Sequence, residues 1–346
     1  MSAGPTGVLL IQLGTPASPA VADVRRYLRE FLSDPRVLDV PALARRLLLE
    51  LAILPRRPRK SAAAYRSIWT PEGSPLLVHS RALAQAVARA LGPGFAVELG
   101  MRYGEPSLRG ALARLRAAGA ERVVVAPLYP QYAASSGGSA LARAFELASE
   151  SWDVPALSAL APFHADPGFL DASAAVAREP LAGFGADHVL FSFHGLPERQ
   201  VRRSDPTGAH CLARPDCCEV ASPAHRRCYR AQCAATARAL AARLGLAPNA
   251  WSYSFQSRLG RTPWIRPYTD ERLPELAAAG VKRLAVVCPS FVADCLETVE
   301  EIGLRGREQW RGLGGDALLL VPSLNDHPAW VAALASLLRR AAGARS

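Results

Sequence analysis

The sequence predicts an α/β protein of two domains, each built on a four-stranded parallel sheet flanked by helices. Three observations lead to this prediction. The chain has 346 residues, enough for about two domains. Half of these residues are hydrophobic, so a large core can be buried. Short apolar runs alternate with longer helical patterns along the whole chain, which is typical of βαβ units.

Eight short apolar runs are the predicted strands, and they divide into two groups of four. Each run is rich in residues that favour β-structure and lies between helical patterns, as parallel pairing requires. The runs cover Val8–Leu13, Ala96–Met101, Val123–Pro127, Leu157–Ala161, His188–Phe193, Trp251–Phe255, Leu284–Cys288 and Leu318–Val321.

Apolar residues recur at helical spacing between these runs. The predicted helices cover Ala20–Leu32, Ser80–Leu91, Ser107–Ala117, Ala140–Ser149, Asp171–Arg178, Tyr229–Leu244, Val292–Gln309 and Pro328–Arg340. Proline and glycine cluster near residue 163, which separates an N-terminal domain, 1–163, from a C-terminal domain, 164–325. The segment 326–346 contains a basic amphipathic helix. Such a helix can lie on a membrane, but packing onto its own protein is the commoner outcome.

The composition restricts the partners and the location of the protein. A net charge of +11 suits an anionic partner or simply a solvated basic surface. The basic residues are scattered and are not interleaved with aromatic residues, which argues against nucleic acid. The apolar run 47–54 is too short to span a membrane, and 1–7 lacks the basic residues of a signal peptide. We therefore expect a cytoplasmic protein, with peripheral attachment at the inner membrane face as an open alternative.

The strongest chemical signal lies where the fifth predicted strand ends. His194 follows an apolar run and precedes Gly195 and Pro197, so it stands where a strand gives way to a loop. In open α/β sheets, ligands bind at the carboxyl ends of strands. A neutral imidazole there can bind a divalent metal or move protons, although a lone histidine is as often a satisfied structural residue.

An acidic segment follows the seventh predicted strand. Glu297 and Glu301 are four residues apart and would share one helix face, and Asp294, three residues before Glu297, would face the same way. Three carboxylates in a row would attract a divalent cation and relay protons. The alternative is a solvated acidic helix face, the usual fate of such a run.

Five of the seven cysteines lie in an insertion at 204–233, with the spacing C-x5-C-C-x9-C-x4-C. An irregular loop of this length needs a reason to be ordered, and metal ligation supplies one. Four thiolates can hold Zn²⁺ or a [2Fe–2S] cluster, and the irregular spacing favours the cluster without settling the choice. Adjacent cysteines rarely ligate one site together. The preferred ligands are Cys211, Cys218, Cys228 and Cys233, with Cys217 as the alternative.

Several ordered motifs resemble those of the ferrochelatases, the enzymes that insert ferrous iron into a porphyrin in haem synthesis. The segment Ser192–Pro197 resembles the histidine signature of that family, and the acidic segment 294–301 resembles the helix that faces this histidine. The other matching segments are Gln12–Pro16, Tyr65–Trp69 with Gly73–Leu76, Arg102–Tyr103, Tyr129–Tyr132, Phe255–Arg258 and Pro263–Trp264. The matches run nearly from end to end.

The resemblance implies two similar Rossmann-like domains with the active-site cleft between them. It implies that His194 and Glu297 bind the substrate Fe²⁺ or carry its protons, with Glu301 and Asp294 beside them. It also places the cysteine-rich insertion among the bacterial members with an internal [2Fe–2S] segment. One departure concerns Cys295, which stands where animal members have a histidine. This difference puts a metal-delivery role of that position in doubt.

The resemblance further implies that the substrate is a dicarboxylic porphyrin, protoporphyrin IX, with coproporphyrin left open. A flat macrocycle needs an apolar slot, and its propionates need cations and hydroxyl groups. The candidate porphyrin-binding residues are Leu13, Arg57, Tyr65, Ser74, Arg102, Tyr103, Tyr129, Tyr132 and Trp264. A rival interpretation is a redox-responsive binding protein in which a cluster is the functional centre. The sequence does not determine the oligomeric state.

Overall fold

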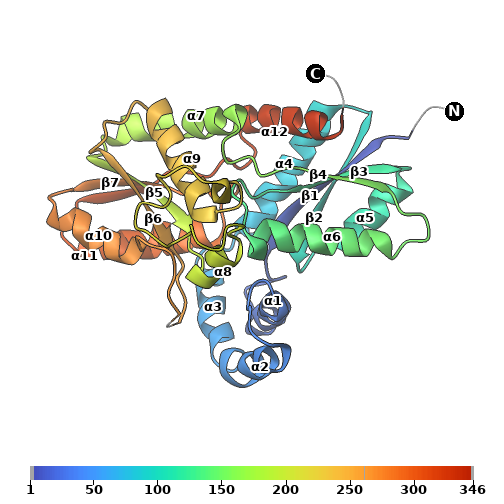
Figure 1. Cartoon of the computed structure of the whole chain (residues 1–346), viewed down its shortest axis with the longest axis horizontal. Helices are drawn as coiled ribbons and strands as arrows, with labels where there is room; N and C mark the ends of the chain where they lie inside the picture. The colour runs from blue at the N-terminus through green and yellow to red at the C-terminus, as the bar shows by residue number, and fades with distance from the viewer. Residues whose placement is uncertain (1–3, 261, 344–346) are drawn as a thin grey trace. The chain divides into compact units, whose positions relative to one another are not determined.

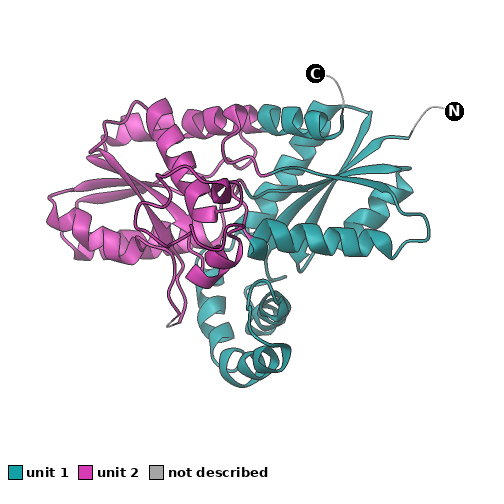
Figure 2. Ribbon diagram, in the orientation of Figure 1, with its two compact units in different colours: residues 1–129, 134–161, 331–346 teal, residues 130–133, 162–330 magenta. Residues whose placement is uncertain are grey.

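The structure is a computed structural model that describes residues 4–260 and 262–343. The chain divides into two compact units (Figure 2). Unit 1 contains the residues up to 129, residues 134–161 and the residues from 331 onward, and unit 2 contains residues 130–133 and 162–330. Each unit holds one four-stranded sheet in which all pairs are parallel, so the predicted fold class is confirmed.

The sheet of unit 1 has the strand order β2-β1-β3-β4. Its strands are β1 (Thr6–Gly14), β2 (Phe95–Tyr103), β3 (Arg122–Pro127) and β4 (Ala156–Ala159). Its helices are α1 (Val21–Ser33), α2 (Ala42–Leu47), η1 (Leu48–Ile53), α3 (Arg57–Arg66), α4 (Pro75–Leu91), α5 (Leu108–Ala117), η2 (Ala134–Gly138) and α6 (Ser139–Ser149). Helices cover both faces of the sheet (Figure 1). The central strand β1 is therefore almost entirely buried, with Val8 to Ile11 fully inaccessible to solvent.

The sheet of unit 2 has the order β6-β5-β7-β8. Its strands are β5 (His188–His194), β6 (Trp251–Gln256), β7 (Arg283–Val287) and β8 (Ala317–Leu320). Its helices are α7 (Pro167–Phe184), α8 (Glu198–Arg203), η3 (Pro223–Arg226), α9 (Tyr229–Arg243), α10 (Thr269–Ala278), η4 (Leu296–Gly306) and α11 (Arg307–Gly312). One core layer places Leu273, Ile302 and Trp310 against strand residues Leu190 and Val286. This layer fixes α10 and η4 against the sheet.

The helix α12 (Pro328–Ala341) ends the described chain. In unit 2, Trp330 at its start packs against Phe163 and Phe169. In unit 1, Arg339 near its end donates a hydrogen bond of 2.6 Å to the carbonyl oxygen of Ala90. None of the helices in the described ranges is long and apolar enough to cross a membrane.

Several helical segments differ from expectation. Periodicity predicts no element over residues 42–66 or 269–278, yet the first stretch contains α2, η1 and α3 and the second forms α10. The helix expected over 292–309 begins only at Leu296 and is a π-helix as far as Gly306, after which α11 continues. Periodicity alone does not reveal either a late start or a π-helical geometry, because both depend on tertiary hydrogen bonds.

Candidate active site

His194 is the last residue of β5, and its imidazole is only partly buried. Its Nδ1 atom lies 2.6 Å from the carbonyl oxygen of Gly195. A carbonyl oxygen only accepts, so Nδ1 carries the proton in this contact, and Nε2 is the nitrogen that could accept one in the neutral ring. The ring lies between Trp264 and Phe291, whose ring centroids are 6.4 and 6.3 Å away. The contact with Gly195 thus fixes Nδ1 as the nitrogen that donates within the protein.

The backbone of His194 is held on both sides by residues that sequence reasoning missed. Its N–H donates to the hydroxyl of Ser290 at 3.0 Å, and its carbonyl oxygen accepts from the hydroxyl of Tyr229 at 2.8 Å. Tyr229 begins α9 and is buried. The partners are 96 and 35 residues away from His194 in sequence, so a local sequence pattern cannot predict these contacts.

Glu301 lies on η4, and the charges of His194 and Glu297 act on its carboxylate. Its carboxylate accepts two hydrogen bonds from Ser257, one from the backbone N–H at 2.9 Å and one from the hydroxyl at 2.6 Å. Burial raises the pKa of Glu301, and the charge of Glu297 adds to this, while Ser257 and His194 act in the opposite direction. The structure therefore places His194 and Glu297 near enough for their charges to affect Glu301.

Gln256 connects the end of β6 to the same helix. Its Nε2 donates to the carbonyl oxygen of Glu297 at 2.7 Å, and its Oε1 accepts from the hydroxyl of Ser192 at 2.7 Å. The next residue, Ser257, has a positive φ of 66°, a conformation that side-chain-bearing residues rarely adopt. Such strained backbone is common at functional sites. Both residues lie in the motif quoted above, which could have singled them out.

Asp294 does not share the helix face of Glu297, and that expectation was wrong. It precedes the first residue of η4, because Cys295 caps the helix. Its carboxylate accepts from the side-chain amide of Asn325 at 2.9 Å and from the hydroxyl of Thr298 at 3.0 Å. These bonds direct Asp294 into the loop that precedes α12.

Arg102 and Tyr103 are joined in unit 1 by a buried carboxylate that sequence reasoning did not consider. Asp34 accepts from Arg102 at 2.6 Å, from the hydroxyl of Tyr103 at 2.8 Å and from Ser139 at 2.5 Å. Burial alone would raise the pKa of Asp34, but hydrogen bonds from Ser139, the backbone of Arg36 and Tyr103 outweigh it and lower the pKa. Much of the donor capacity of Arg102 is thus used within the unit.

Several polar groups near the carboxyl ends of β1 and β3 are buried without a hydrogen-bond partner among the described residues. They are the amide nitrogen of Gln12 and the hydroxyls of Thr15 and Tyr129. Buried polar atoms are normally paired, so unpaired ones mark a place where a ligand could supply the partner. Leu13 at the end of β1 is partly buried beside them in sequence.

The remaining porphyrin candidates occupy different elements. Arg57 begins α3, and Tyr65 lies near its end, where its ring contacts those of Tyr27 and Trp69. Ser74 caps α4 by accepting from the N–H of Leu77. In unit 2, the backbone N–H of Tyr132 donates to Gln232 at 2.7 Å, and Trp264 is nine-tenths buried beside His194.

All five cysteines of the insertion are buried; we call Cys211, Cys217, Cys218, Cys228 and Cys233 the cysteine block. Burial raises the pKa of Cys211, and a hydrogen bond with Cys228 opposes this. A hydrogen bond with Cys228 and burial raise the pKa of Cys218.

Arg230 lies beside the block and donates to the sulfur atoms of Cys217 at 3.6 Å and Cys218 at 3.4 Å. Burial raises the pKa of Cys233. A hydrogen bond with Tyr229 opposes this shift, and the charge of Cys218 adds to it. Within the described ranges, no group of three or more His, Cys, Asp or Glu side chains is disposed to hold a metal ion.

Known proteins match this chain over almost its entire length. A family model described as ferrochelatase matches residues 5–342. The ferrochelatase of Azotobacter vinelandii is 55% identical over 333 residues, covering 96% of this chain and 98% of that protein. The ferrochelatase of Coxiella burnetii (strain CbuK_Q154) is 48% identical over 334 residues, covering 96% and 93%.

Two solved structures share the fold. SirB from Bacillus subtilis with Fe³⁺ has a TM-score of 0.53 at 14% identity, covering 98% of this chain and 96% of that chain. The sirohydrochlorin chelatase SirB from Bacillus subtilis subspecies spizizenii, in complex with cobalt, has a TM-score of 0.55 at 11% identity with the same coverage. These similarities concern the fold alone. The family match and the 55% identity across the chain establish that this protein belongs to the ferrochelatase family.

Proposed function

We propose that His194, Glu297 and Glu301 handle the metal and the protons in the reaction of this ferrochelatase, which inserts ferrous iron into a porphyrin to form haem. The observation that carries the proposal is an imidazole whose Nδ1 contacts the carbonyl oxygen of Gly195 and whose charge, together with that of Glu297, acts on the buried carboxylate of Glu301. Iron insertion replaces two pyrrole protons by one Fe²⁺, so the site must both bind a cation and remove protons. An imidazole and carboxylates suit both tasks.

In this proposal, Nε2 of His194 accepts a pyrrole proton or contacts the entering Fe²⁺. Glu297 and Glu301 attract the hydrated cation and pass protons outward along η4. The raised pKa of Glu301 suits a group that takes up and releases protons. Asp294 is bound to Asn325 and Thr298, so we assign it the positioning of η4 instead of a step in the chemistry.

The porphyrin in this proposal is protoporphyrin IX. We assign its apolar contacts to Leu13, Tyr65, Tyr129, Tyr132 and Trp264, and its propionates to Arg57 and Ser74. Arg102 and Tyr103 would act indirectly, because Asp34 already engages both. Placement of the macrocycle between the two domains stays a prediction.

His194→Ala tests the proposal directly. We expect anaerobic iron insertion to fall at least about a hundredfold, the range typical of a lost general base, while porphyrin still binds. His327→Ala is the matched control, because His327 is exposed and its ring only accepts from the backbone N–H of Ala329. Normal turnover by His194→Ala would refute the assignment.

We also propose that the cysteine block holds a [2Fe–2S] cluster. The donor chemistry supports the proposal, although these side chains are not disposed as a metal-binding group in the described ranges: five buried thiols occur in one segment, and Arg230 donates to two of the sulfurs. The contacts support Cys211, Cys218 and Cys228 as ligands and leave Cys233 or Cys217 as the fourth. When bound, such a cluster supplies one-electron redox chemistry.

We further propose a cytoplasmic enzyme that binds the anionic inner membrane surface through α2 and η1. Leu43, Leu47, Leu48 and Leu51 are 71%, 51%, 41% and 71% exposed, and the exposed Arg46 lies among them in sequence. An exposed apolar patch beside basic residues fits an anionic lipid surface. Figure 1 shows α2 as a part of unit 1 that stands away from its sheet.

Sedimentation with vesicles of phosphatidylglycerol tests this surface. The double variant Leu43→Glu and Leu51→Glu should remain in the supernatant, while Leu313→Glu, an exposed leucine on a different segment, should sediment like the wild type. Equal sedimentation of all three proteins would refute the proposal. Loss of dimers in the double variant, without any vesicle binding by the wild type, would assign the patch to self-association.

A further inference from the structure

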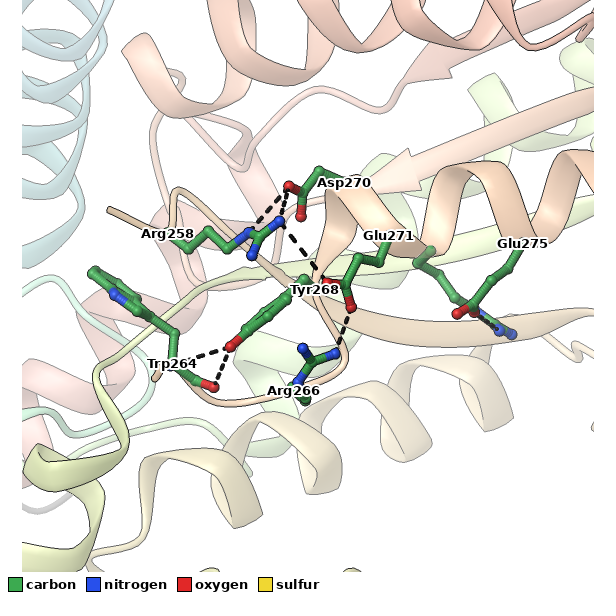
Figure 3. Close-up of polar contacts among 8 residues, drawn as sticks. Arg258, Trp264, Arg266, Tyr268, Asp270, Glu271 and Glu275 are labelled. Carbon is green, nitrogen blue, oxygen red and sulfur yellow. Dashed lines mark hydrogen bonds and ion pairs between the residues drawn. The ribbon is translucent and has the colours of Figure 1, made fainter. Parts of the chain in front are cut away.

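Tyr268 lies between two arginines at the end of the loop that joins β6 to α10. The guanidinium carbon of Arg258 is 4.4 Å from the centroid of its ring, and that of Arg266 is 4.2 Å away. Figure 3 shows the two guanidiniums approaching the tyrosine from different sides. Each contact is a cation–π interaction, which restrains the plane of the ring.

The two arginines are themselves held by the first turn of α10. Arg258 donates to Asp270 at 2.6 Å, and Arg266 forms an ion pair with Glu271 (Figure 3). The side chains of both pairs are largely exposed, so the pairs contribute little to stability as such. Their arrangement around one buried aromatic ring needs another explanation.

The hydroxyl of Tyr268 holds both polar groups of the Trp264 main chain. It accepts from the Trp264 N–H at 3.2 Å and donates to the Trp264 carbonyl oxygen at 3.0 Å. The indole N–H of Trp264 donates to the carbonyl oxygen of Leu259 at 2.9 Å. The backbone and the side chain of this tryptophan are therefore fixed separately.

Trp264 in turn lies against the end of β5. A Cβ atom added to Gly195 would lie 2.9 Å from the backbone oxygen of Gln256 and 3.1 Å from the Trp264 ring, so glycine allows this close approach. The next residue, Ile265, donates from its N–H to the carbonyl oxygen of Leu196 at 2.9 Å. The indole ring reaches the imidazole of His194, with the ring centroids 6.4 Å apart.

We infer that Tyr268 is a positioning residue for the porphyrin: it fixes Trp264 as a rigid wall beside His194. This inference rests on the proposed function of His194 and Trp264. The arginines and carboxylates around Tyr268 keep its ring in place, and its hydroxyl transmits this restraint to the tryptophan backbone. A rigid wall lowers the entropy lost when a flat ligand is bound against it.

Tyr268→Phe tests the inference, because it removes the hydroxyl and leaves a ring for both guanidiniums. Two lost hydrogen bonds should raise the KM for porphyrin about tenfold, with the KM for Fe²⁺ unchanged. Glu271→Gln should produce a smaller effect in the same direction. Glu275→Gln is the matched control, since Glu275 pairs with Arg272 on the same helix without contacting Tyr268 or Trp264 (Figure 3).

A second readout does not depend on activity. The fluorescence of Trp264 is obtained by subtracting the spectrum of the corresponding Trp264→Phe protein, and its acrylamide quenching is then measured. Quenching should increase in Tyr268→Phe and remain unchanged in Glu275→Gln. Unchanged KM and unchanged quenching in Tyr268→Phe would overturn the inference. An inactive wild type would refute the proposed function instead, and the quenching would still decide whether Tyr268 restrains Trp264.

Discussion

Ser257 donates two hydrogen bonds to the carboxylate of Glu301, from its backbone N–H and from its hydroxyl. This serine adopts a positive φ of 66° directly after β6, and that conformation aims both donors at η4. The contact favours the ionised form of a carboxyl whose burial favours the neutral form. Ser257 therefore opposes the rise in the pKa of Glu301 that burial causes.

Ser257→Ala should shift the acid limb of the pH–rate profile to higher pH. Loss of the hydroxyl removes an interaction that lowers the pKa of Glu301, so the neutral form persists to higher pH and the proton acceptor is lost earlier on acidification. The profile of kcat against pH measures this shift. Ser173→Ala, which removes a hydroxyl bound to a carbonyl oxygen within α7, should leave the profile unchanged. If the acid limb does not move in Ser257→Ala, protonation of Glu301 is not the step that limits the rate at low pH.

Glu297→Gln should lower kcat about a hundredfold or more, because the amide neither attracts Fe²⁺ nor accepts protons as a carboxylate does. Steady-state kinetics under anaerobic conditions measures the change. Glu300→Gln, on the same helix, removes only an ion pair with Arg305 and should keep near-normal turnover. Equal losses in both variants would indicate damage to η4 instead of to the chemistry.

Asp34→Asn should destabilise the folded protein by about 3 kcal/mol at pH 7, since it leaves the partly buried Arg102 without its counter-charge. The pKa of Asp34 is lowered by folding, so its contribution is present above the unfolded pKa of about 3.9 and is lost as the pH falls through the folded value. Urea unfolding across this pH range measures the difference. Glu150→Gln breaks an exposed pair with Arg109 and should leave the free energy of unfolding nearly unchanged.

Cys228→Ser should remove the visible absorption and the bound iron and sulfide of the purified protein. Cys228 is hydrogen-bonded to both Cys211 and Cys218, so it is the proposed ligand that contacts the other two. Cys288→Ala, a buried cysteine outside the block, should retain them. Metal analysis with an absorption spectrum measures both. A colourless wild type that contains zinc would contradict the cluster.

The sequence predicted much of the fold because its signals are local. All eight expected strands are present, since apolar runs between helical patterns are short-range features. His194 was expected at the end of a strand from the apolar run before it and from Gly195 and Pro197 after it, and it is the last residue of β5. The family resemblance rested on contiguous motifs, and the comparisons confirmed it.

Only the tertiary structure decided what surrounds those residues. The helix that was expected to include Asp294 starts after this residue, whose carboxylate accepts hydrogen bonds from Asn325 and Thr298. Ser290 and Tyr229 reach the backbone of His194 from distant segments, and Tyr268 secures Trp264 through a cluster of charges that no periodicity reveals. A sequence states which groups are available, whereas long-range hydrogen bonds, formed only when the chain is folded, select the ones that meet.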